Sequence, residues 1–180
     1  MSRRIVVTEF VTLDGVMEDP GGSEGTSFGG WAFKFERGEA GNRFKLEELM
    51  EADAQLLGRK TYEGFAQAWP GREDEAGFAD KMNSMRKFVV SSTLRDPEWN
   101  NSQVIGLDGV ESLEGTILVA GSHQLVQALF ERGLVDEVRL VLYPTVLGAG
   151  KKLFEVPADF TLVSADPSEQ VVLLRYLRSS

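Results

Sequence analysis

Three turns in this sequence have residue types that bind phosphate groups. Each follows a short apolar segment, and the turns are Gly58-Arg59-Lys60-Thr61, Ser91-Ser92 and Gly121-Ser122. In the first turn, two cations and the free N–H groups of a helix start would meet the same anion. Ligands of open α/β sheets bind beyond the carboxyl ends of the strands, so three neighbouring turns predict a cradle for an extended anion. The alternatives are a solvated Arg-Lys pair and ordinary serine turn chemistry.

Two aromatic residues, Trp31 and Phe33, follow a loop of glycine, serine, aspartate and proline over residues 19–30. Flat heterocycles stack well on aromatic rings, so both residues could form a wall of a substrate pocket. The alternative is that these aromatics cap the hydrophobic core. The sequence leaves both interpretations open.

Charge and composition exclude several classes of partner. The formal net charge is −9, so we expect neither nucleic acid nor an anionic membrane as a partner. There is no cysteine and His123 is the one histidine, which excludes disulfides and thiolate metal sites, and we expect no metal. No apolar stretch reaches membrane-spanning length, and the amino-terminal residues lack the apolar core of a signal peptide. We therefore expect a cytoplasmic protein.

Apolar segments separated by glycine turns predict an α/β fold in a single domain over residues 1–180. The clearest unit is a βαβ unit, in which a helix with Ser122 as its N-cap joins two buried strands. We expect a mixed, mainly parallel sheet flanked by helices, with four segments in its centre: 5–11, 86–90, 116–120 and 137–142.

Two further elements follow from periodicity and turn signals. A helix capped by Asn42 is expected to face inward with Leu46, Leu49 and Met50, and to face water with Glu47, Glu48 and Glu51. Residues 160–163 and 171–177 should form a closing antiparallel pair with Asp166-Pro167 in the turn.

The order and spacing of several motifs resemble the dihydrofolate reductase-like superfamily. The motifs are Thr12-Leu13-Asp14-Gly15, Gly58-Arg59-Lys60-Thr61, Ala120-Gly121-Ser122, and Pro144-Thr145-Val146-Leu147-Gly148-Ala149-Gly150-Lys151 with Leu153-Phe154. They are most similar to the reductase domain of the riboflavin-biosynthesis deaminase-reductase and its stand-alone bacterial relatives. The resemblance covers nearly the whole chain and implies a three-layer dihydrofolate reductase-like fold.

The resemblance also implies roles for individual residues. The Gly58 turn would hold the phosphates of a nicotinamide dinucleotide, and Gly121-Ser122 would face its pyrophosphate. Ser91-Ser92 would contact the adenosine ribose and its 2′ substituent. The turn that contains Thr12 and Asp14 would lie beside the nicotinamide and the substrate. A reductase must let a proton reach its substrate, so we expect Asp14 to be the catalytic group; the alternative is an aspartate that only bonds the turn backbone.

These inferences favour a reductase that uses NADPH to transfer a hydride to a pyrimidine- or pteridine-like small molecule. The activity would resemble that of 5-amino-6-(5-phosphoribosylamino)uracil reductase of riboflavin biosynthesis. Two alternatives remain: a non-catalytic protein of the same fold that binds a nucleotide or heterocycle, and a subunit whose closing strands pair with a partner, as in a homodimer. A substrate phosphate would need a cation, and Lys34, Arg37 and Arg43 are equal candidates on the sequence.

Overall fold

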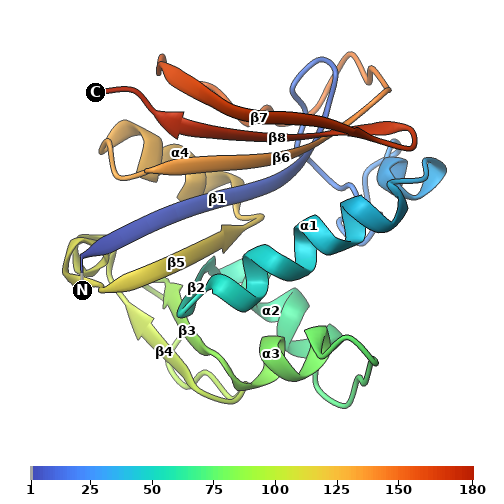
Figure 1. The fold of residues 1–180 in the computed structure, drawn as a ribbon. Helices are drawn as coiled ribbons and strands as arrows, with labels where there is room; N and C mark the ends of the chain where they lie inside the picture. Colours follow the sequence, from blue (N-terminus) through green and yellow to red (C-terminus); the bar gives the residue numbers. More distant parts are fainter. Residues whose placement is uncertain (1) are drawn as a thin grey trace.

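The computed structural model describes residues 2–180 and contains one sheet of eight strands in the order β4-β3-β2-β5-β1-β6-β8-β7 (Figure 1). The strands are β1 (Arg3–Thr12), β2 (Ala54–Gly58), β3 (Arg86–Val90), β4 (Ser102–Ile105), β5 (Gly115–Ala120), β6 (Glu137–Tyr143), β7 (Phe160–Ser168) and β8 (Val171–Arg178). The helices are α1 (Gly38–Glu51), α2 (Arg59–Ala68), α3 (Phe78–Ser84) and α4 (His123–Glu131), with 3-10 helices η1 (Trp31–Lys34) and η2 (Leu107–Ser112).

The six strands from β4 to β6 are parallel, and β8 and β7 add an antiparallel edge. The expected mixed, mainly parallel sheet is therefore confirmed. The expected central position of segment 86–90 is wrong, because β3 lies next to the edge strand β4 and β2 takes the central place. An apolar run indicates that both faces of a strand are covered, but it carries no information about strand order.

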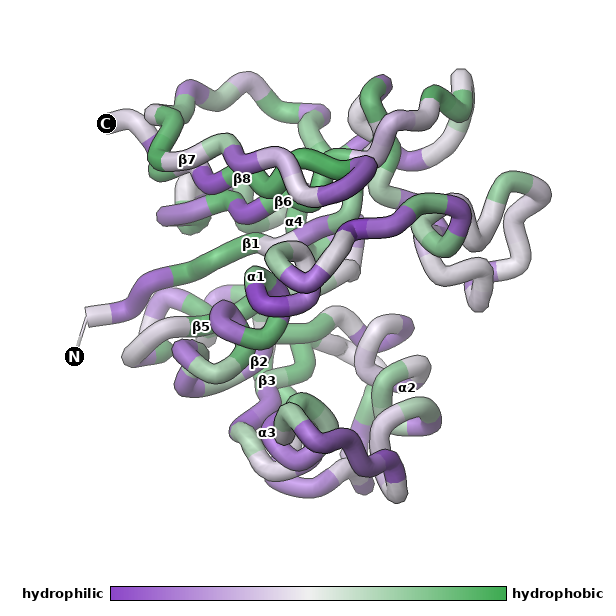
Figure 2. Tube along the Cα trace, turned by 45° about the vertical axis from the view of Figure 1, so that its right-hand side comes forward, coloured by the Kyte–Doolittle hydropathy of each residue, from purple (hydrophilic) through white to green (hydrophobic). Residues whose placement is uncertain are grey.

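Helices cover both faces of the sheet, which gives the three expected layers. On one face, α1, α2 and α3 contribute Leu49, Tyr62 and Met82 to a shared core cluster. On the other face, α4 contributes Leu125, Val126 and Leu129 to a second cluster. Figure 1 shows α1 in front of the sheet and α4 behind it, and Figure 2 shows a hydrophilic segment leading into α3.

Within residues 2–180, none of the helices combines the length and apolar character needed to cross a membrane.

Helix α1 begins at Gly38, before the expected cap, and turns a different face to the sheet. Glu48, which we expected in water, is 2% exposed, while Met50, which we expected in the core, is 42% exposed. Thr8 Oγ1 donates a hydrogen bond to Glu48 Oε1 at 2.7 Å, and Lys45 forms an ion pair with the same carboxylate. A glutamate with such partners can be buried, and apolar periodicity does not register the partners.

The closing strands pair as expected, but the turn between them lies at residues 169–170. Strand β7 continues through Asp166 and Pro167, where the sequence predicted the turn, and Pro167 lies opposite Val172. Proline lacks a backbone N–H, and an edge strand such as β7 tolerates this loss. A β-bulge between Leu162 and Ser164 shifts the register once along the same strand.

Candidate active site

The carboxyl ends of β2 and β5 lie side by side, and the turns that follow them are joined. The two strands pair in parallel, and β2 ends at Gly58 while β5 ends at Ala120. The N–H of Gly58 donates a hydrogen bond to Ser122 Oγ at 2.8 Å, across 64 residues of sequence. This bond brings together two of the three phosphate-type turns predicted from the sequence.

Gly121 allows the second turn to approach the start of α2. Its φ of +68° lies in the left-handed region, and an added Cβ would lie 3.2 Å from Thr61 Oγ1. A Cβ on Gly58 would lie 3.1 Å from Ser122 Oγ. The two turns therefore have no room for side chains, and they leave the first N–H groups of α2 and α4 at the same end of the sheet.

Ser122 does not cap α4, which corrects the expectation from the sequence. Its φ is +64°, and its side chain makes no capping bond to the helix, because the hydroxyl instead accepts from Gly58. The first N–H groups of α4 are thus not occupied by Ser122. The next residue, His123, places its Nε2 at 3.1 Å from Glu155 Oε1, at the surface and outside the turn contacts.

The charged and hydroxyl side chains of the turns after β2 and β3 lie at the same end of the sheet. Arg59 forms an exposed ion pair with Glu63 at 3.1 Å, one helical turn along α2. Ser91 follows β3, the neighbour of β2, and its Oγ accepts hydrogen bonds from the N–H groups of Thr93 and Leu94. Lys60 and Ser92 are both exposed. The three turns are therefore adjacent, as the cradle requires.

Asp14 lies just beyond the end of β1, and both oxygens of its carboxylate accept hydrogen bonds. It accepts hydrogen bonds from Thr12 Oγ1, from the N–H of Leu147, and from the N–H of Gly148 at 2.8 Å. The Thr12 hydroxyl and the Gly148 amide hold the pKa of Asp14 below its usual range. The group is therefore ionised at neutral pH, and it ties the glycine-rich loop at residues 145–150 to the end of β1.

The two aromatic candidates separate in the structure. Trp31 is fully buried, its indole N–H donates to the Glu18 carbonyl at 2.8 Å, and its ring meets Tyr143 edge-on. Trp31 thus caps the core, which is the alternative that the sequence left open. Phe33 is 81% exposed, so its ring is accessible to a ligand.

Glu9 is a candidate that reasoning from the sequence missed. It lies on β1, one residue beyond the pairing of Thr8 with Ala120, and its side chain is 6% exposed. Within residues 2–180, its Oε1 has no hydrogen-bond partner. Burial raises the pKa of Glu9 from 4.5 to about 8, although the charge of Lys45 and the backbone amide of Gly121 act in the opposite direction. Glu9 therefore carries a proton at neutral pH, next to the turn at Gly121.

A signal for Glu9 is present in the sequence. The segment at residues 5–11 is apolar apart from Thr8 and Glu9, and a carboxylate in the middle of a buried strand is unusual. Burial of a titratable group without a full set of partners is costly and is common at functional sites.

Similarity to known proteins covers most of the chain. The model of the family described as RibD C-terminal domain matches residues 3–113 and 110–172. The uncharacterized protein YyaP of Bacillus subtilis (strain 168) is 32% identical over 162 residues, which are 84% of this chain and 80% of YyaP.

Two solved structures share the fold at low sequence identity. A putative riboflavin biosynthesis protein from Shewanella sp. PV-4 has a TM-score of 0.75 at 16% identity, with 100% of both chains covered. RibD of Acinetobacter baumannii has a TM-score of 0.67 at 16% identity, with 99% of this chain and 58% of that protein covered. Because the family model spans most of the sequence and the fold agrees, this chain belongs to the RibD C-terminal domain family, which is reductase-like.

Proposed function

We propose that this protein is an NADPH-dependent reductase that transfers a hydride to a pyrimidine- or pteridine-like small molecule. Membership of the RibD C-terminal domain family supports a reductase-like role. The observation that carries the proposal is the joined pair of turns, in which Gly58 bonds Ser122 and Gly121 lies against Thr61. Close backbone approach and free helix N–H groups are what a dinucleotide diphosphate requires.

The residues at this edge fit NADP in particular. The N–H groups that begin α2 and α4 would face the diphosphate, and the exposed Lys60 would add positive charge. Arg59 is our proposed partner for the 2′-phosphate that distinguishes NADP from NAD. Its pair with Glu63 joins side chains that are 45% and 47% exposed, and such helix pairs contribute only about 0.3–0.5 kcal/mol. The guanidinium can therefore turn to a phosphate at little cost.

When bound, reduced NADP would supply the hydride for an electrophilic carbon of the substrate. The chain itself must then provide a proton for the nitrogen or oxygen bonded to that carbon. Asp14 is ionised at neutral pH, so in this proposal it positions the loop at residues 145–150 beside the substrate. Glu9 holds a proton below a pH of about 8, and it is our candidate for the proton source.

Two measurements on the full-length protein test the proposal. The first is titration with NADPH and NADH by quenching of tryptophan fluorescence, for which we expect saturation and tighter binding of NADPH. The second is consumption of NADPH, followed by its absorbance, with a panel of dihydropteridines and ribosylamino-pyrimidines. Absence of NADPH binding would overturn the proposal. Tight binding without turnover on any member of the panel would favour the non-catalytic alternative.

A further inference from the structure

Lys87 is a buried cation to which the proposed reaction assigns no role. It lies on β3 and is completely buried, and within residues 2–180 it forms no ion pair with a carboxylate. Burial lowers the pKa of Lys87 from 10.5 to about 8, so the side chain is still charged at neutral pH. A buried charge without an acidic partner is costly, and lysine is rarely buried to this extent. Other groups must therefore hold the ammonium.

Three backbone carbonyls and an indole ring surround the ammonium group of Lys87. Its Nζ donates one hydrogen bond to each of the carbonyls of Asn83, Met85 and Asn100, at 3.0, 2.9 and 2.8 Å respectively. The same atom lies 4.3 Å from the centroid of the Trp99 ring. An ammonium has three donors, so all of them are used, and the ring adds a cation–π contact. The charge thus joins the end of α3 to the connection between β3 and β4.

Trp99 extends these contacts to the start of α2. The backbone N–H of Trp99 donates a hydrogen bond to the Tyr62 hydroxyl at 3.0 Å, and the two ring centroids are 6.1 Å apart. Tyr62 is buried and follows Thr61, whose side chain faces Gly121 where the two turns meet. The contacts of Lys87 therefore reach the turn that is proposed to receive the diphosphate.

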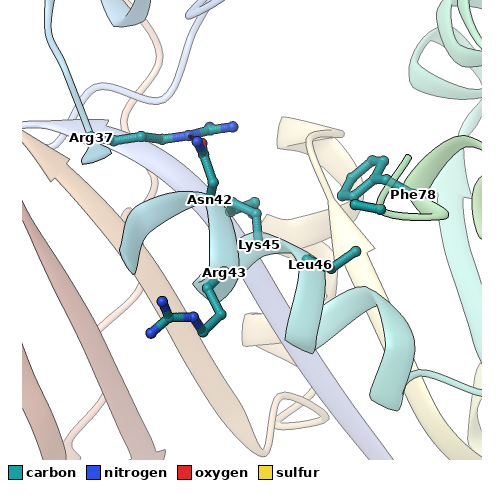
Figure 3. Close-up of a pocket in the computed structure, with 7 residues that line it drawn as sticks. Arg37, Asn42, Arg43, Lys45, Leu46 and Phe78 are labelled. Atoms are coloured by element: carbon teal, nitrogen blue, oxygen red, sulfur yellow. Dashed lines mark hydrogen bonds between the residues drawn. The ribbon is translucent and has the colours of Figure 1, made fainter. Parts of the chain in front are cut away.

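Asn83 extends the same contacts to the far end of α2. Its Nδ2 donates a hydrogen bond to the carbonyl of Trp69, the C-cap of α2, and its Oδ1 accepts one from the indole N–H of Trp99, both at 2.9 Å. The ring of Trp69 lies 5.2 Å from that of Phe78, which begins α3. Phe78 in turn lines a pocket of about 380 Å³ together with Leu46 of α1 (Figure 3). Helix α2 is therefore held at both ends.

We propose that Lys87 is a positioning residue for the phosphate turn at the start of α2. Its ammonium group holds Trp99 and Asn83, which fix the two ends of this helix. The Gly58 N–H then stays bonded to Ser122 Oγ, and the two turns remain joined. An apolar side chain could fill the same space at lower cost, but it could not bond three carbonyls at once. The inference rests on the proposed function, because it gives this network a task in binding a dinucleotide diphosphate.

Hydrogen exchange in the full chain without cofactor tests the positioning role directly. The Gly58 amide donates to Ser122 Oγ at 2.8 Å, so its exchange rate reports whether the turns stay joined. Lys87→Met keeps a long side chain but removes the charge and the three donors. We expect exchange at Gly58 to become about tenfold faster, while exchange in the ladder between β1 and β6 stays unchanged. Equal acceleration at all amides would show that Lys87 supports only overall stability.

Titration with NADPH and NADH measures the consequence for cofactor binding. We expect Lys87→Met to weaken both by about tenfold, because the network acts on the turn for the diphosphate that both cofactors share. Val138→Ala is the matched control. Val138 is completely buried on β6, which β1 and β5 separate from β2, so its variant should lose stability without losing affinity.

Tyr62→Phe separates positioning from general stability. It removes only the hydroxyl that accepts from the Trp99 N–H, and it should weaken NADPH binding by about threefold. In the Tyr62→Phe background, Lys87→Met should cause a smaller further loss than in the parent, because one contact between the network and α2 is already broken. If Lys87→Met fails to fold, Tyr62→Phe decides the question, since parent-like NADPH binding and parent-like exchange at Gly58 would then refute the inference.

Three other results would overturn this inference: unchanged exchange at Gly58 in Lys87→Met, a loss of affinity no larger than that of Val138→Ala, or strictly additive losses in the double variant. None of them concerns NADPH binding by the parent, so the proposed function would survive. Conversely, if the parent failed to bind NADPH while Lys87→Met still selectively accelerated exchange at Gly58, the reductase proposal alone would fail.

Discussion

The two sides of the proposed site use their polar groups in opposite ways. At the turns after β2 and β3, charged side chains are exposed, and the ion pair of Arg59 with Glu63 is weak and local. At the end of β1, the carboxylate of Asp14 is held within the protein, since it accepts three hydrogen bonds from Thr12 and the 145–150 loop. An open edge can exchange water for a charged ligand with little rearrangement, whereas a closed edge presents a fixed surface. We infer that the open edge recognises its ligand through charge, and that the end of β1 supplies a fixed, hydrogen-bonded wall.

Glu9 is the strongest test of the closed side, because its buried carboxyl depends on remaining neutral. The pKa of Glu9 in the folded protein, about 8, lies above its ordinary value of 4.5. Below pH 4.5, the carboxyl group is therefore protonated in both the folded and the unfolded protein. As the pH rises towards 8, the unfolded chain releases this proton first, and stability should fall by up to about 1.4 kcal/mol per pH unit. Glu9→Gln should remove this slope, so the variant gains stability relative to the parent between pH 5 and pH 8.

Chemical denaturation at several pH values measures the effect of Glu9. Glu63→Gln is a suitable control, because Glu63 is on the surface and its substitution should leave the slope in place. If the parent and Glu9→Gln gave parallel curves of stability against pH, Glu9 would be an ordinary ionised glutamate. It could not then serve as the proton source.

Gly121→Val should have the largest effect on the open side. The new Cβ would sit close to Thr61 Oγ1, and a β-branched residue at φ +68° is strained, so the turn must move away from α2. We expect NADPH affinity to fall about 100-fold, which corresponds to about 2.7 kcal/mol, measured by fluorescence titration. Gly64→Ala within α2 is the control, because nothing lies within 4 Å of its added Cβ. Normal NADPH binding by Gly121→Val would mean that this turn faces something other than the cofactor.

Asp14→Asn tests whether Asp14 only holds the 145–150 loop in place or also takes part in the reaction. The substitution keeps the size of the side chain but removes the charge that the Leu147 and Gly148 N–H groups bond. We expect a loss of about 1.5 kcal/mol in the free energy of unfolding and faster hydrogen exchange at these two amides. NADPH affinity should stay close to that of the parent. A variant that kept its stability but lost all turnover would instead make Asp14 part of the chemistry.

Arg59→Ala should have the smallest effect on the fold and the most selective effect on binding. The residue is exposed, so the melting temperature should hardly change. NADPH binding should weaken about tenfold and NADH binding should stay nearly the same, because only NADPH carries the 2′-phosphate. Glu63→Ala should act in the opposite direction, since it removes the carboxylate that competes for Arg59. Equal losses for both cofactors would place Arg59 on the shared diphosphate instead.

The features that the sequence predicted well are local ones. The apolar run before Gly121, the stripe of Leu125 and Leu129, and the glycine after the helix are all read within a short window, and the structure has this βαβ unit. The turns at Gly58 and Ser122 were also found, because glycine and serine after a strand are local signals. Their adjacency followed from the general geometry of parallel sheets.

The features that the sequence did not yield depend on partners far along the chain. Glu48 is buried because Thr8 lies opposite, 40 residues away, and the role of Ser122 is set by Gly58, 64 residues away. Glu9 becomes a neutral acid because of its burial and its position beside Gly121. Hydrophobic periodicity identifies each of these only as a polar residue, because it carries no information about contacts between distant parts of the chain.

The outer edge of β7 has a consequence for self-association. Pro167 removes one backbone donor from this edge, and the bulge between Leu162 and Ser164 breaks its regular spacing. Both features disfavour continuous strand addition along β7 by a second copy and so help to protect the edge against fibril-like growth. A contact between two copies on this side of the sheet would bury side chains face to face instead, and exposed Leu162 and Val163 on β7 provide apolar surface for it.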